Sequence, residues 1–297
     1  MIPLGWMPRL LLQRFWDGAD RYVLDPAVGR PINKLRAELG LTVPVSKVLD
    51  AWWHAPQRVI ALWPEWFAPP PPDWPRQAVY CGFPLYDERD TADVPAELEP
   101  FLASGEAPIA FTPGSAMMFG QRFFRAAVEA CQRLGMRGLL LSRSAHHIPA
   151  DLPPGVRYVP FAPFSRILPR CRALVHHGGI GTLSQALAAG VPQLVMPMAH
   201  DQWDNAARLK RLGVGASLLP RFFTGRRLAA KLRNLLLGPG ARATTARCQA
   251  LAAQIHEGEA LERACDLLER LAESPNVSNR SPVTAGETPL ERHHAPV

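Results

Sequence analysis

The chain has 297 residues, of which 47% are hydrophobic and 20% charged, so it can bury a sizeable core and is not disordered throughout. Lys and Arg number 33 and Asp and Glu 26, and the resulting net charge of +7 favours an anionic ligand. The five cysteines lie far apart without a C-x-x-C pair, which argues against a disulfide framework and a structural zinc site and favours a reducing, cytoplasmic location. No run of ~18 apolar residues occurs, so no membrane-spanning helix is expected.

The first 68 residues are rich in Trp and Leu and show helical patterns over residues 31–39 and 45–53. Arg9 and Arg14 interrupt the apolar N-terminus, and no small-residue cleavage site follows, so this segment is a poor signal peptide. Consecutive prolines at 69–72 remove backbone donors and favour extended polyproline geometry. We therefore place a Pro-rich interdomain linker over residues 69–104.

From residue 105 onward, apolar runs alternate with helical patterns. The expected strands cover residues 108–112, 138–142, 156–160, 172–176 and 193–196, and the expected helices cover residues 121–134, 180–189, 201–212 and parts of 241–271. Such alternation is typical of right-handed βαβ units, so an α/β fold with a Rossmann-like parallel sheet is predicted for residues 105–272. The remaining residues, 273–297, are rich in Ser, Pro, Asn and Thr and are expected to form a disordered tail.

The segment ALVHHGGIGT, residues 173–182, carries the strongest functional pattern. A buried strand runs into a glycine-rich turn, and a helix begins at once. Glycines let the backbone bend sharply and approach a ligand, while the helix directs its free N–H groups and positive dipole end into the turn. Such a turn suits a diphosphate, to which His177 and the Thr182 hydroxyl can donate hydrogen bonds. On glycine spacing alone, a tight turn that binds nothing is an equally good interpretation.

Two neighbouring segments add to this pattern. The helix continues as SQALAAGVP and is followed by Q at residue 193, and PMAHDQ occupies residues 197–202. With H-H-G-G-x-G-T, A-G-V-P-Q and D-Q in order and at the expected spacing, residues 105–270 resemble the C-terminal donor-binding half of nucleotide-sugar glycosyltransferases with the glycosyltransferase-B fold. More narrowly, they are similar to bacterial macrolide, sterol and rhamnolipid glycosyltransferases. The resemblance implies that His177 and the backbone of Gly178, Gly179, Gly181 and Thr182 hold the donor diphosphate.

The resemblance also implies roles for four other residues. Asp201 and Gln202 would hydrogen-bond the hydroxyls of the donor sugar, since a carboxylate and an amide together accept and donate; Asp201 can instead be only a helix N-cap. Ser115 corresponds to a serine that reaches the phosphates, with a plain turn as the alternative. Phe161 lies where the family holds the nucleotide base, and can stack on the base or simply pack in the core.

The N-terminal segment departs from the family pattern. Such enzymes have two Rossmann-like halves, and a histidine near the start of the first half acts as general base. Here the first histidine is His54, in a Trp-rich stretch, and no glycine-rich strand–turn–helix precedes it. Residues 1–68 are therefore interpreted as the remnant of an incomplete N-terminal acceptor domain. No catalytic base is assigned; it would belong to the missing part.

The predicted function is that of a hexosyltransferase of the UDP-glycosyltransferase type, which moves a sugar from a UDP- or dTDP-sugar to a hydroxyl of an apolar lipid, polyketide or terpenoid acceptor with inversion. The alternative is a donor-binding fragment that binds the nucleotide sugar without catalysis; a nucleotide-sugar epimerase fits the D-Q pair less well. Neither a cofactor nor a metal is expected. A nucleic-acid partner is not favoured, because the basic stretch 221–233 lacks an aromatic platform beyond its two phenylalanines, and peripheral membrane contact is left open.

Overall fold

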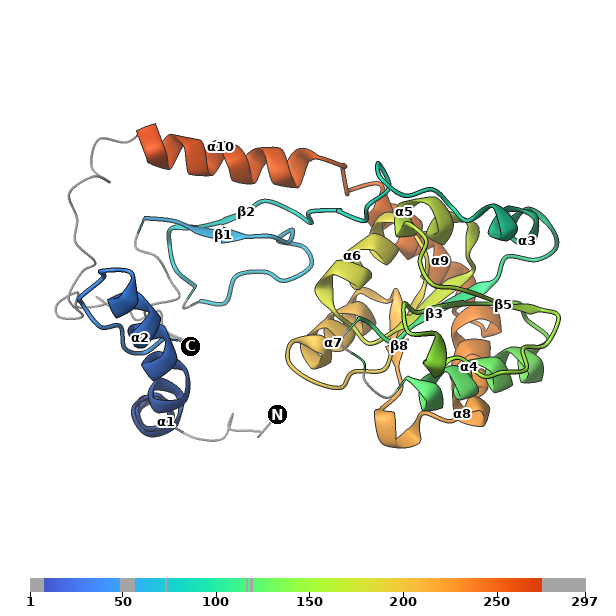
Figure 1. Ribbon diagram of the computed structural model, residues 1–297, viewed down its shortest axis with the longest axis horizontal. Helices are drawn as coiled ribbons and strands as arrows, with labels where there is room; N and C mark the ends of the chain where they lie inside the picture. The colour runs from blue at the N-terminus through green and yellow to red at the C-terminus, as the bar shows by residue number, and fades with distance from the viewer. Residues whose placement is uncertain (1–7, 49–56, 73, 116, 118–119, 274–297) are drawn as a thin grey trace. The chain divides into compact units, whose positions relative to one another are not determined.

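A computed structural model describes residues 8–48, 57–72, 74–115, 117 and 120–273 (Figure 1). It divides into two compact units, which are described separately: one comprises residues 1–61, 71–79 and 264–297, and the other residues 62–70 and 80–263. Helix α10 (Glu259–Glu273) extends across the boundary in the sequence between the two units.

The first unit is built mainly from consecutive helical segments. These are α1 (Arg9–Ala19), the π-helical η1 (Asp20–Gly29) and α2 (Arg30–Glu38). A two-stranded sheet pairs β1 (Val59–Ala61) with β2 (Ala78–Tyr80). The helix expected over 31–39 is thus confirmed as α2.

The helix expected over residues 45–53 is wrong where the structure describes it, since residues 45–48 are not helical and 49–53 lie outside the described residues. The cause is the Asp25 carboxylate, which accepts hydrogen bonds from the backbone N–H of Lys47 at 2.8 Å and of Val48 at 3.2 Å. Lys47 accordingly adopts a left-handed backbone with a φ of 49°. A side-chain acceptor more than 20 residues earlier in the chain has replaced the helical hydrogen bonds of this segment.

The second unit contains a six-stranded parallel sheet in the order β5-β4-β3-β6-β7-β8. Its strands are β3 (Ile109–Thr112), β4 (Gly138–Leu141), β5 (Val156–Val159), β6 (Ala173–His176), β7 (Gln193–Val195) and β8 (Gly215–Ser217). The five expected strands are confirmed within a residue or two at their ends. Strand β8 was not anticipated, because the sequence of residues 215–217 is Gly-Ala-Ser and lacks an apolar run.

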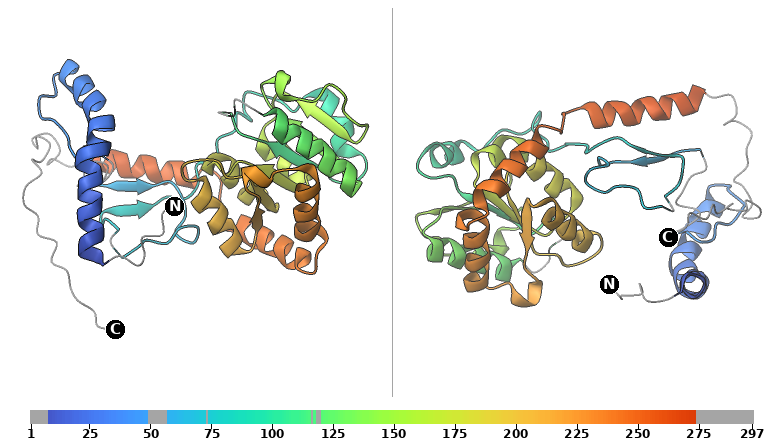
Figure 2. Two further views of the ribbon diagram at one scale, coloured as in Figure 1. Left: turned by 90° about the horizontal axis from the view of Figure 1, so that it is seen from below. Right: turned by 180° about the vertical axis from the view of Figure 1, so that it is seen from behind.

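Helices cover both faces of this sheet, as Figures 1 and 2 show. They are α3 (Glu99–Ala103), α4 (Gln121–Leu134), α5 (Phe164–Ile167), α6 (Ile180–Ala188), α7 (Gln202–Leu212), α8 (Gly225–Leu237) and α9 (Ala241–Ala252), with short 3₁₀ turns η2 (Ala96–Leu98), η3 (Ala145–His147), η4 (Leu168–Arg170) and η5 (Pro220–Phe222). The expected helix ends at Gly190 and Gly213 are confirmed by left-handed φ angles of 67° and 72°.

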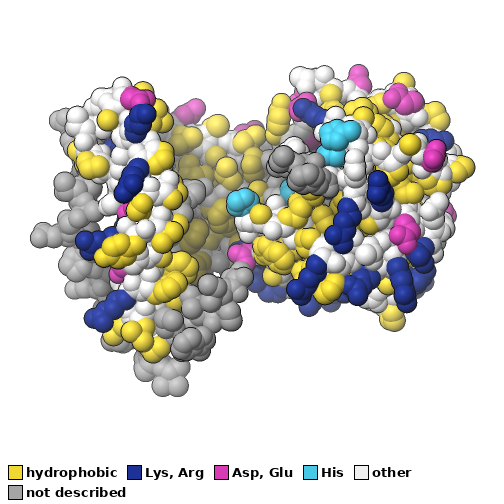
Figure 3. Space-filling view, turned by 60° about the horizontal axis from the view of Figure 1, so that its bottom comes forward, with side chains coloured by type: hydrophobic (Ala, Val, Ile, Leu, Met, Phe, Trp, Pro, Cys, Tyr) yellow, Lys and Arg dark blue, Asp and Glu magenta, His cyan; other side chains and the backbone are white. Residues whose placement is uncertain are grey.

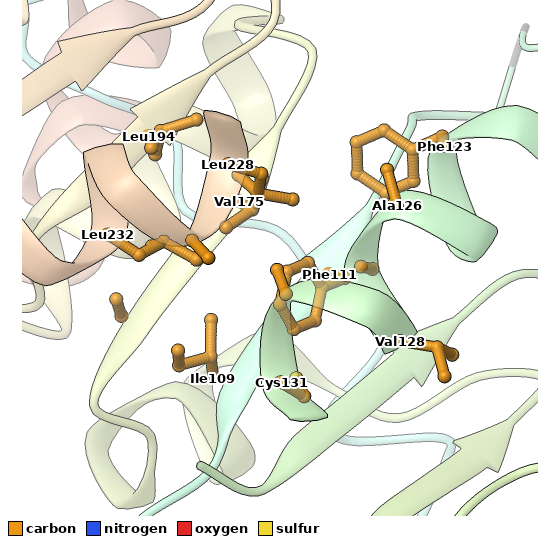
Figure 4. Packing of buried hydrophobic residues seen from close by; sticks show 14 of the residues in the cluster. Ile109, Phe111, Phe123, Ala126, Val128, Cys131, Val175, Leu194, Leu228 and Leu232 are labelled. Carbon is orange, nitrogen blue, oxygen red and sulfur yellow. The ribbon is translucent and has the colours of Figure 1, made fainter. Parts of the chain in front are cut away.

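Side chains that alternate along the strands divide the core into two layers. Ile109, Phe111 and Val175 pack with α4 and α8, including Leu228 (Figure 4), whereas Ala110 and the other alternating positions pack with α3, α5 and α6. This alternation is the two-residue period of a β-strand, and burial on both faces explains why the strands are continuous apolar runs. The fold class predicted from the sequence is therefore confirmed for the sheet-containing unit.

The core of this unit also includes residues from the expected linker and from the segment before it. Phe67 and Phe83 pack with Leu183, Leu187 and other residues of α6 and α7, and Leu98 and Phe101 belong to the layer under α5. The boundaries expected at residues 68, 104 and 272 remain predictions, but residues 62–70 and 80–104 are packed parts of the second unit.

Candidate functional site

The sheet changes direction between β3 and β6. The chain proceeds from β3 outward to β4 and β5, then returns to β6 on the other side of β3 and continues outward through β7 and β8. Strands β3 and β6 are parallel neighbours, with Thr112 opposite His176 at their carboxyl ends. The loops that follow these two strands lead to helices on opposite faces. Open α/β sheets bind ligands at such a topological switch point. We call the space between these two loops the crevice.

The glycine-rich turn after β6 lies at this switch point. Gly178 has a φ of 98°, a left-handed conformation that L side chains rarely adopt, and a Cβ there would lie 2.7 Å from Val195 Cγ1. Gly179 is the N-cap of α6, which begins at Ile180 as expected. The first-turn N–H groups of an α-helix have no partner within the helix, so those of residues 180–182 are available to an anion at this end.

His176 fixes the conformation of this turn from beneath. Its side chain is fully buried; Nδ1 accepts a hydrogen bond from the Gly178 N–H at 3.1 Å, and Nε2 lies 2.9 Å from Gln193 Oε1. Because Nδ1 is an acceptor here, the proton is on Nε2, which donates to Gln193. Burial, reinforced by His177, lowers the pKa of His176 to about 3, so the ring is neutral at physiological pH. Gln193 thereby supports the turn through His176.

His177 is half-buried, and its ring lies between two glycine turns. A Cβ on Gly179 would lie 2.4 Å from His177 Nε2, and a Cβ on Gly114 would lie 2.6 Å from its Cε1. Nδ1 of His177 is buried without a hydrogen-bond partner among the described residues. Burial lowers the pKa of His177, and the charge of Asp201 opposes this shift. A neutral imidazole with an unpaired buried nitrogen is suited to bond a ligand that enters the crevice.

The turn after β3 provides the opposite side of the crevice. Gly114 has a φ of 89°, and its N–H lies 3.5 Å from the Thr112 hydroxyl. Ser115, the next residue, is exposed. Ser115 thus directly follows Gly114, whose backbone passes close enough to His177 that an added Cβ would meet the ring. A phosphate contact of Ser115 stays a prediction. Residues 116, 118 and 119 lie outside the described residues.

The start of α7 presents Asp201 and Gln202 beside the same turn. Asp201 is exposed and occupies the N-cap position, but its carboxylate makes no capping hydrogen bond; instead Oδ2 accepts from Asn205 Nδ2 at 2.8 Å. Gln202 Oε1 accepts from the backbone N–H groups of Met198 and Ala199 at 2.8 and 3.1 Å. The Gln202 amide is thus oriented with its carbonyl occupied and its NH₂ left to donate. Preceding both, His200 has a left-handed φ of 53°.

Phe161 follows the edge strand β5 and is separated from β6 by β3 and β4. At ~4.8 Å per strand, this places it about 14 Å along the sheet from the glycine turn. Phe161 is half-buried, and the Arg143 guanidinium lies 5.1 Å from its ring centroid. Phe164, the alternative base-stacking residue, packs against the core under α5. Both phenylalanines are half-buried, so a base-stacking role for Phe161 or Phe164 stays a prediction.

Three residues of this arrangement were not assigned a role from the sequence. Asn205 and Gln193 are buried polar residues. The signals that could have found them are the position of Asn205 four residues after Asp201 and that of Gln193 at the end of A-G-V-P-Q. His176 was part of the H-H-G-G-x-G-T pattern but had no role of its own. His146 and His147 have no carboxylate or cysteine at metal spacing in the sequence, which predicts a solvated loop for them. That prediction is wrong for His147, which is buried against Gly120 at the start of α4.

A separate pocket of 410 Å³ lies at the opposite edge of the sheet. Its lining includes Gly105, Arg137 and Pro154, which precede β3, β4 and β5, so it is not part of the crevice. Within the described ranges, no group of three or more His, Cys, Asp or Glu side chains can hold a metal ion. No helix among those residues is long and apolar enough to cross a membrane.

Comparison with known proteins places this fold and turn in a recognised family. Residues 139–263 match the family described as "Erythromycin biosynthesis protein CIII-like, C-terminal domain". The chain is 36% identical over 209 residues to an O-mycaminosyltylonolide 6-deoxyallosyltransferase of Streptomyces fradiae, covering 69% of this chain and 48% of that protein. It is 32% identical over 161 residues to a sterol 3-beta-glucosyltransferase of Arabidopsis thaliana, covering 54% of this chain and 25% of that protein.

Solved structures agree with this placement. The glycotransferase of kitacinnamycin superposes with a TM-score of 0.66 at 26% identity, covering 89% of this chain and 67% of that chain. Together with these likenesses, the parallel sheet and the glycine turn show the fold of the C-terminal half of glycosyltransferase-B proteins. Residues 139–263 carry an EryCIII-like C-terminal domain. The chain spans about half the length of the curated Streptomyces relative.

Proposed function

We propose that the crevice between the β3 and β6 turns binds the diphosphate of a UDP- or dTDP-sugar. The observation that carries the proposal is His177: a half-buried, neutral ring with an unpartnered Nδ1, held between Gly114 and Gly179 directly in front of the α6 N-terminus. Uncoordinated backbone N–H groups and a ring N–H donor suit phosphate oxygens without a metal ion. We therefore propose binding that needs no metal or other cofactor.

The other predicted residues complete a donor site on this proposal. Ser115 adds a hydroxyl from the β3 turn, and Phe161 offers its ring to the base further along the same sheet edge. Asp201 accepts from, and the Gln202 amide donates to, the sugar hydroxyls. The relatives transfer different sugars, 6-deoxyallose and glucose by their names, so no particular sugar is proposed.

The proposed reaction is transfer of the sugar to a hydroxyl of an apolar acceptor with inversion at the anomeric carbon. The acceptor oxygen forms a bond to that carbon while the bond to the diphosphate oxygen breaks, and its electron pair leaves with the nucleotide. The α6 N-terminus and His177 would stabilise the developing charge on the leaving group. The acceptor proton goes to a general base, which remains unassigned in this chain. The sterol named for one relative supports an apolar acceptor.

Calorimetric titration with UDP, dTDP, uridine and thymidine tests the binding step. UDP and dTDP should bind, and the nucleosides should bind far more weakly, because the diphosphate supplies the contacts with the turn. Nucleosides that bind as tightly as the diphosphates would contradict the proposal. Mass spectrometry of mixtures with a UDP- or dTDP-sugar and a sterol or macrolide then separates the transferase from the binding-only alternative.

We also propose that this chain contacts anionic membrane surfaces through its basic face, defined as α4 together with residues 220–237. This face carries eight Lys and Arg against one Glu, a net charge equal to the +7 of the whole chain. Figure 3 shows Lys and Arg side chains gathered along one side of the sheet-containing unit. Phe222 is 37% exposed beside them, and Leu237 is 54% exposed. Such a combination suits anionic lipid headgroups.

Sedimentation with vesicles of phosphatidylglycerol or phosphatidylcholine tests the membrane proposal. The triple variant Arg226→Glu, Arg227→Glu, Lys231→Glu should lose binding to the anionic vesicles. The matched control Lys34→Glu, Lys210→Glu, Arg242→Glu changes the net charge equally at exposed helical positions outside the basic face. Equal losses in both variants would show that net charge alone, and not this face, governs vesicle binding.

A further inference from the structure

Asn205 is a buried polar residue in the first turn and a half of α7, with 2% of its surface exposed. Its side-chain nitrogen makes two hydrogen bonds. Nδ2 donates to the Gly178 carbonyl oxygen at 2.9 Å and to Asp201 Oδ2 at 2.8 Å. One amide group therefore connects the glycine turn after β6 to the carboxylate at the start of α7.

The chemistry of the amide makes this connection specific. A carboxamide nitrogen carries two N–H donors, and here one serves a main-chain carbonyl and the other a carboxylate. Asp or Leu at position 205 would supply neither donor, and a buried carboxylate beside Asp201 would add repulsion. Asn is a poor helix former, and burying its amide is favourable only when its polar atoms are paired. Packing alone would be served equally well by an apolar side chain.

Asn205 also determines which part of Asp201 remains available. The bond at Oδ2 holds the carboxylate toward the helix, and Oδ1 has no hydrogen bond to another described residue. Gln202 is held in the same way, because its carbonyl is bonded to the backbone of residues 198–199. The Asp201 carboxylate, an acceptor, and the Gln202 NH₂ group, a donor, are thus held next to each other and in a fixed position relative to the glycine turn after β6.

We propose that Asn205 is a positioning residue: it holds the Asp201 carboxylate in register with the glycine turn, so that sugar and diphosphate are recognised together. The inference rests on the proposed function of the crevice and adds to it the origin of the preference for a nucleotide sugar over a free nucleotide. Asn205 acts on the sugar only through Asp201, and it touches no ligand itself.

A double-mutant cycle tests this role. The ratio of the dissociation constants for UDP and UDP-glucose, and likewise for dTDP and dTDP-glucose, is measured by calorimetry for the unaltered chain, Asn205→Ala, Asp201→Ala and the double variant. Asn205→Ala should lower the preference for the nucleotide sugar on the order of tenfold, the loss expected for a hydrogen bond to a charged group. In the Asp201→Ala background, the same substitution should leave the ratio unchanged.

Two control variants make the outcomes distinct. Ser184→Ala removes another buried side-chain hydrogen bond, to the Gly181 carbonyl at 2.9 Å, and should not change the ratio. Asn205→Ser keeps one donor, so it should give an intermediate effect and replaces Asn205→Ala if that variant does not fold. Equal losses for nucleotide and nucleotide sugar, or an effect that persists without Asp201, would overturn the positioning role. An unaltered chain that binds none of the four ligands would instead contradict the proposed function.

Discussion

Gly179→Ala should weaken the binding of nucleoside diphosphates without unfolding the protein. The added Cβ would lie 2.4 Å from Nε2 and 3.0 Å from Cε1 of His177, so the imidazole must leave its position between the two glycine turns. The backbone itself accepts alanine, because Gly179 has an ordinary φ of −62°. The fold should lose at most about 1 kcal/mol, the usual cost of alanine at a helix N-cap.

The size of the binding loss follows from the interaction that is removed. A hydrogen bond to a charged group contributes about 1.5–3 kcal/mol, so displacing His177 should lower the affinity for UDP and dTDP roughly 10- to 150-fold. In the His177→Ala variant, the further substitution Gly179→Ala should lower the nucleotide affinity by less than it does in the unaltered chain, since no imidazole ring remains to be displaced.

Calorimetry with UDP and dTDP measures these affinities, and thermal unfolding checks that the variant is folded. Gly155→Ala is a matched control, because no atom lies within 4 Å of the added Cβ and the position is remote in sequence from both turns. A folded Gly179→Ala variant that binds both nucleotides as tightly as the unaltered chain would refute the role assigned to His177.

Further substitutions give distinct results. Asp201→Ala should weaken the binding of a UDP- or dTDP-sugar by at least about 0.5–1.5 kcal/mol more than the binding of the free nucleotide. Equal losses of both binding free energies in calorimetry would show that Asp201 has only a structural role. Gln193→Leu leaves the His176 Nε2 donor unpaired and should lower the free energy of unfolding by about 1–3 kcal/mol in urea; an unchanged midpoint would contradict that bond. Gly178→Ala forces a left-handed φ of 98° on alanine and should lower the melting temperature, unlike Gly155→Ala. Burial lowers the pKa of His176 to about 3, so as the pH falls below ~6.5 a proton binds to this histidine in the unfolded chain but not in the folded one. The free energy of unfolding should therefore fall by about 1.4 kcal/mol per pH unit below ~6.5. A His176→Gln variant with the same acid sensitivity would show that His176 is not its origin.

The sheet and most of its helices were predictable because their determinants are local. The apolar runs at 109–112, 138–141 and 173–176 are strands buried on both faces, and left-handed glycines such as Gly213 end helices where the sequence places them. The glycine turn was equally evident, because a turn of this kind needs glycine at residue 178. Here local preference and tertiary structure agree.

Contacts between distant segments were not predictable in the same way. Asn205 bonds to a carbonyl 27 residues earlier, and Gln193 reaches a histidine 17 residues away, so neither bond has a local sequence pattern. The missed turn at residues 45–48 has the same origin, since Asp25 lies more than 20 residues before it. In each case a polar side chain forms a hydrogen bond with a partner far away in the sequence, and the periodicity of hydrophobic residues does not reveal such bonds.

The most direct test of the central claim is amide chemical-shift mapping by NMR during titration with UDP and dTDP. If the crevice holds the diphosphate, the largest shifts should occur at the amides of residues 178–182 and in the turn of Gly114 and Ser115, with smaller changes at residues 201–205. His177→Ala should abolish or sharply weaken these changes at the same ligand concentration. Shifts confined to other regions, such as the pocket lined by Gly105 and Arg137, or no shifts at millimolar ligand, would contradict the account.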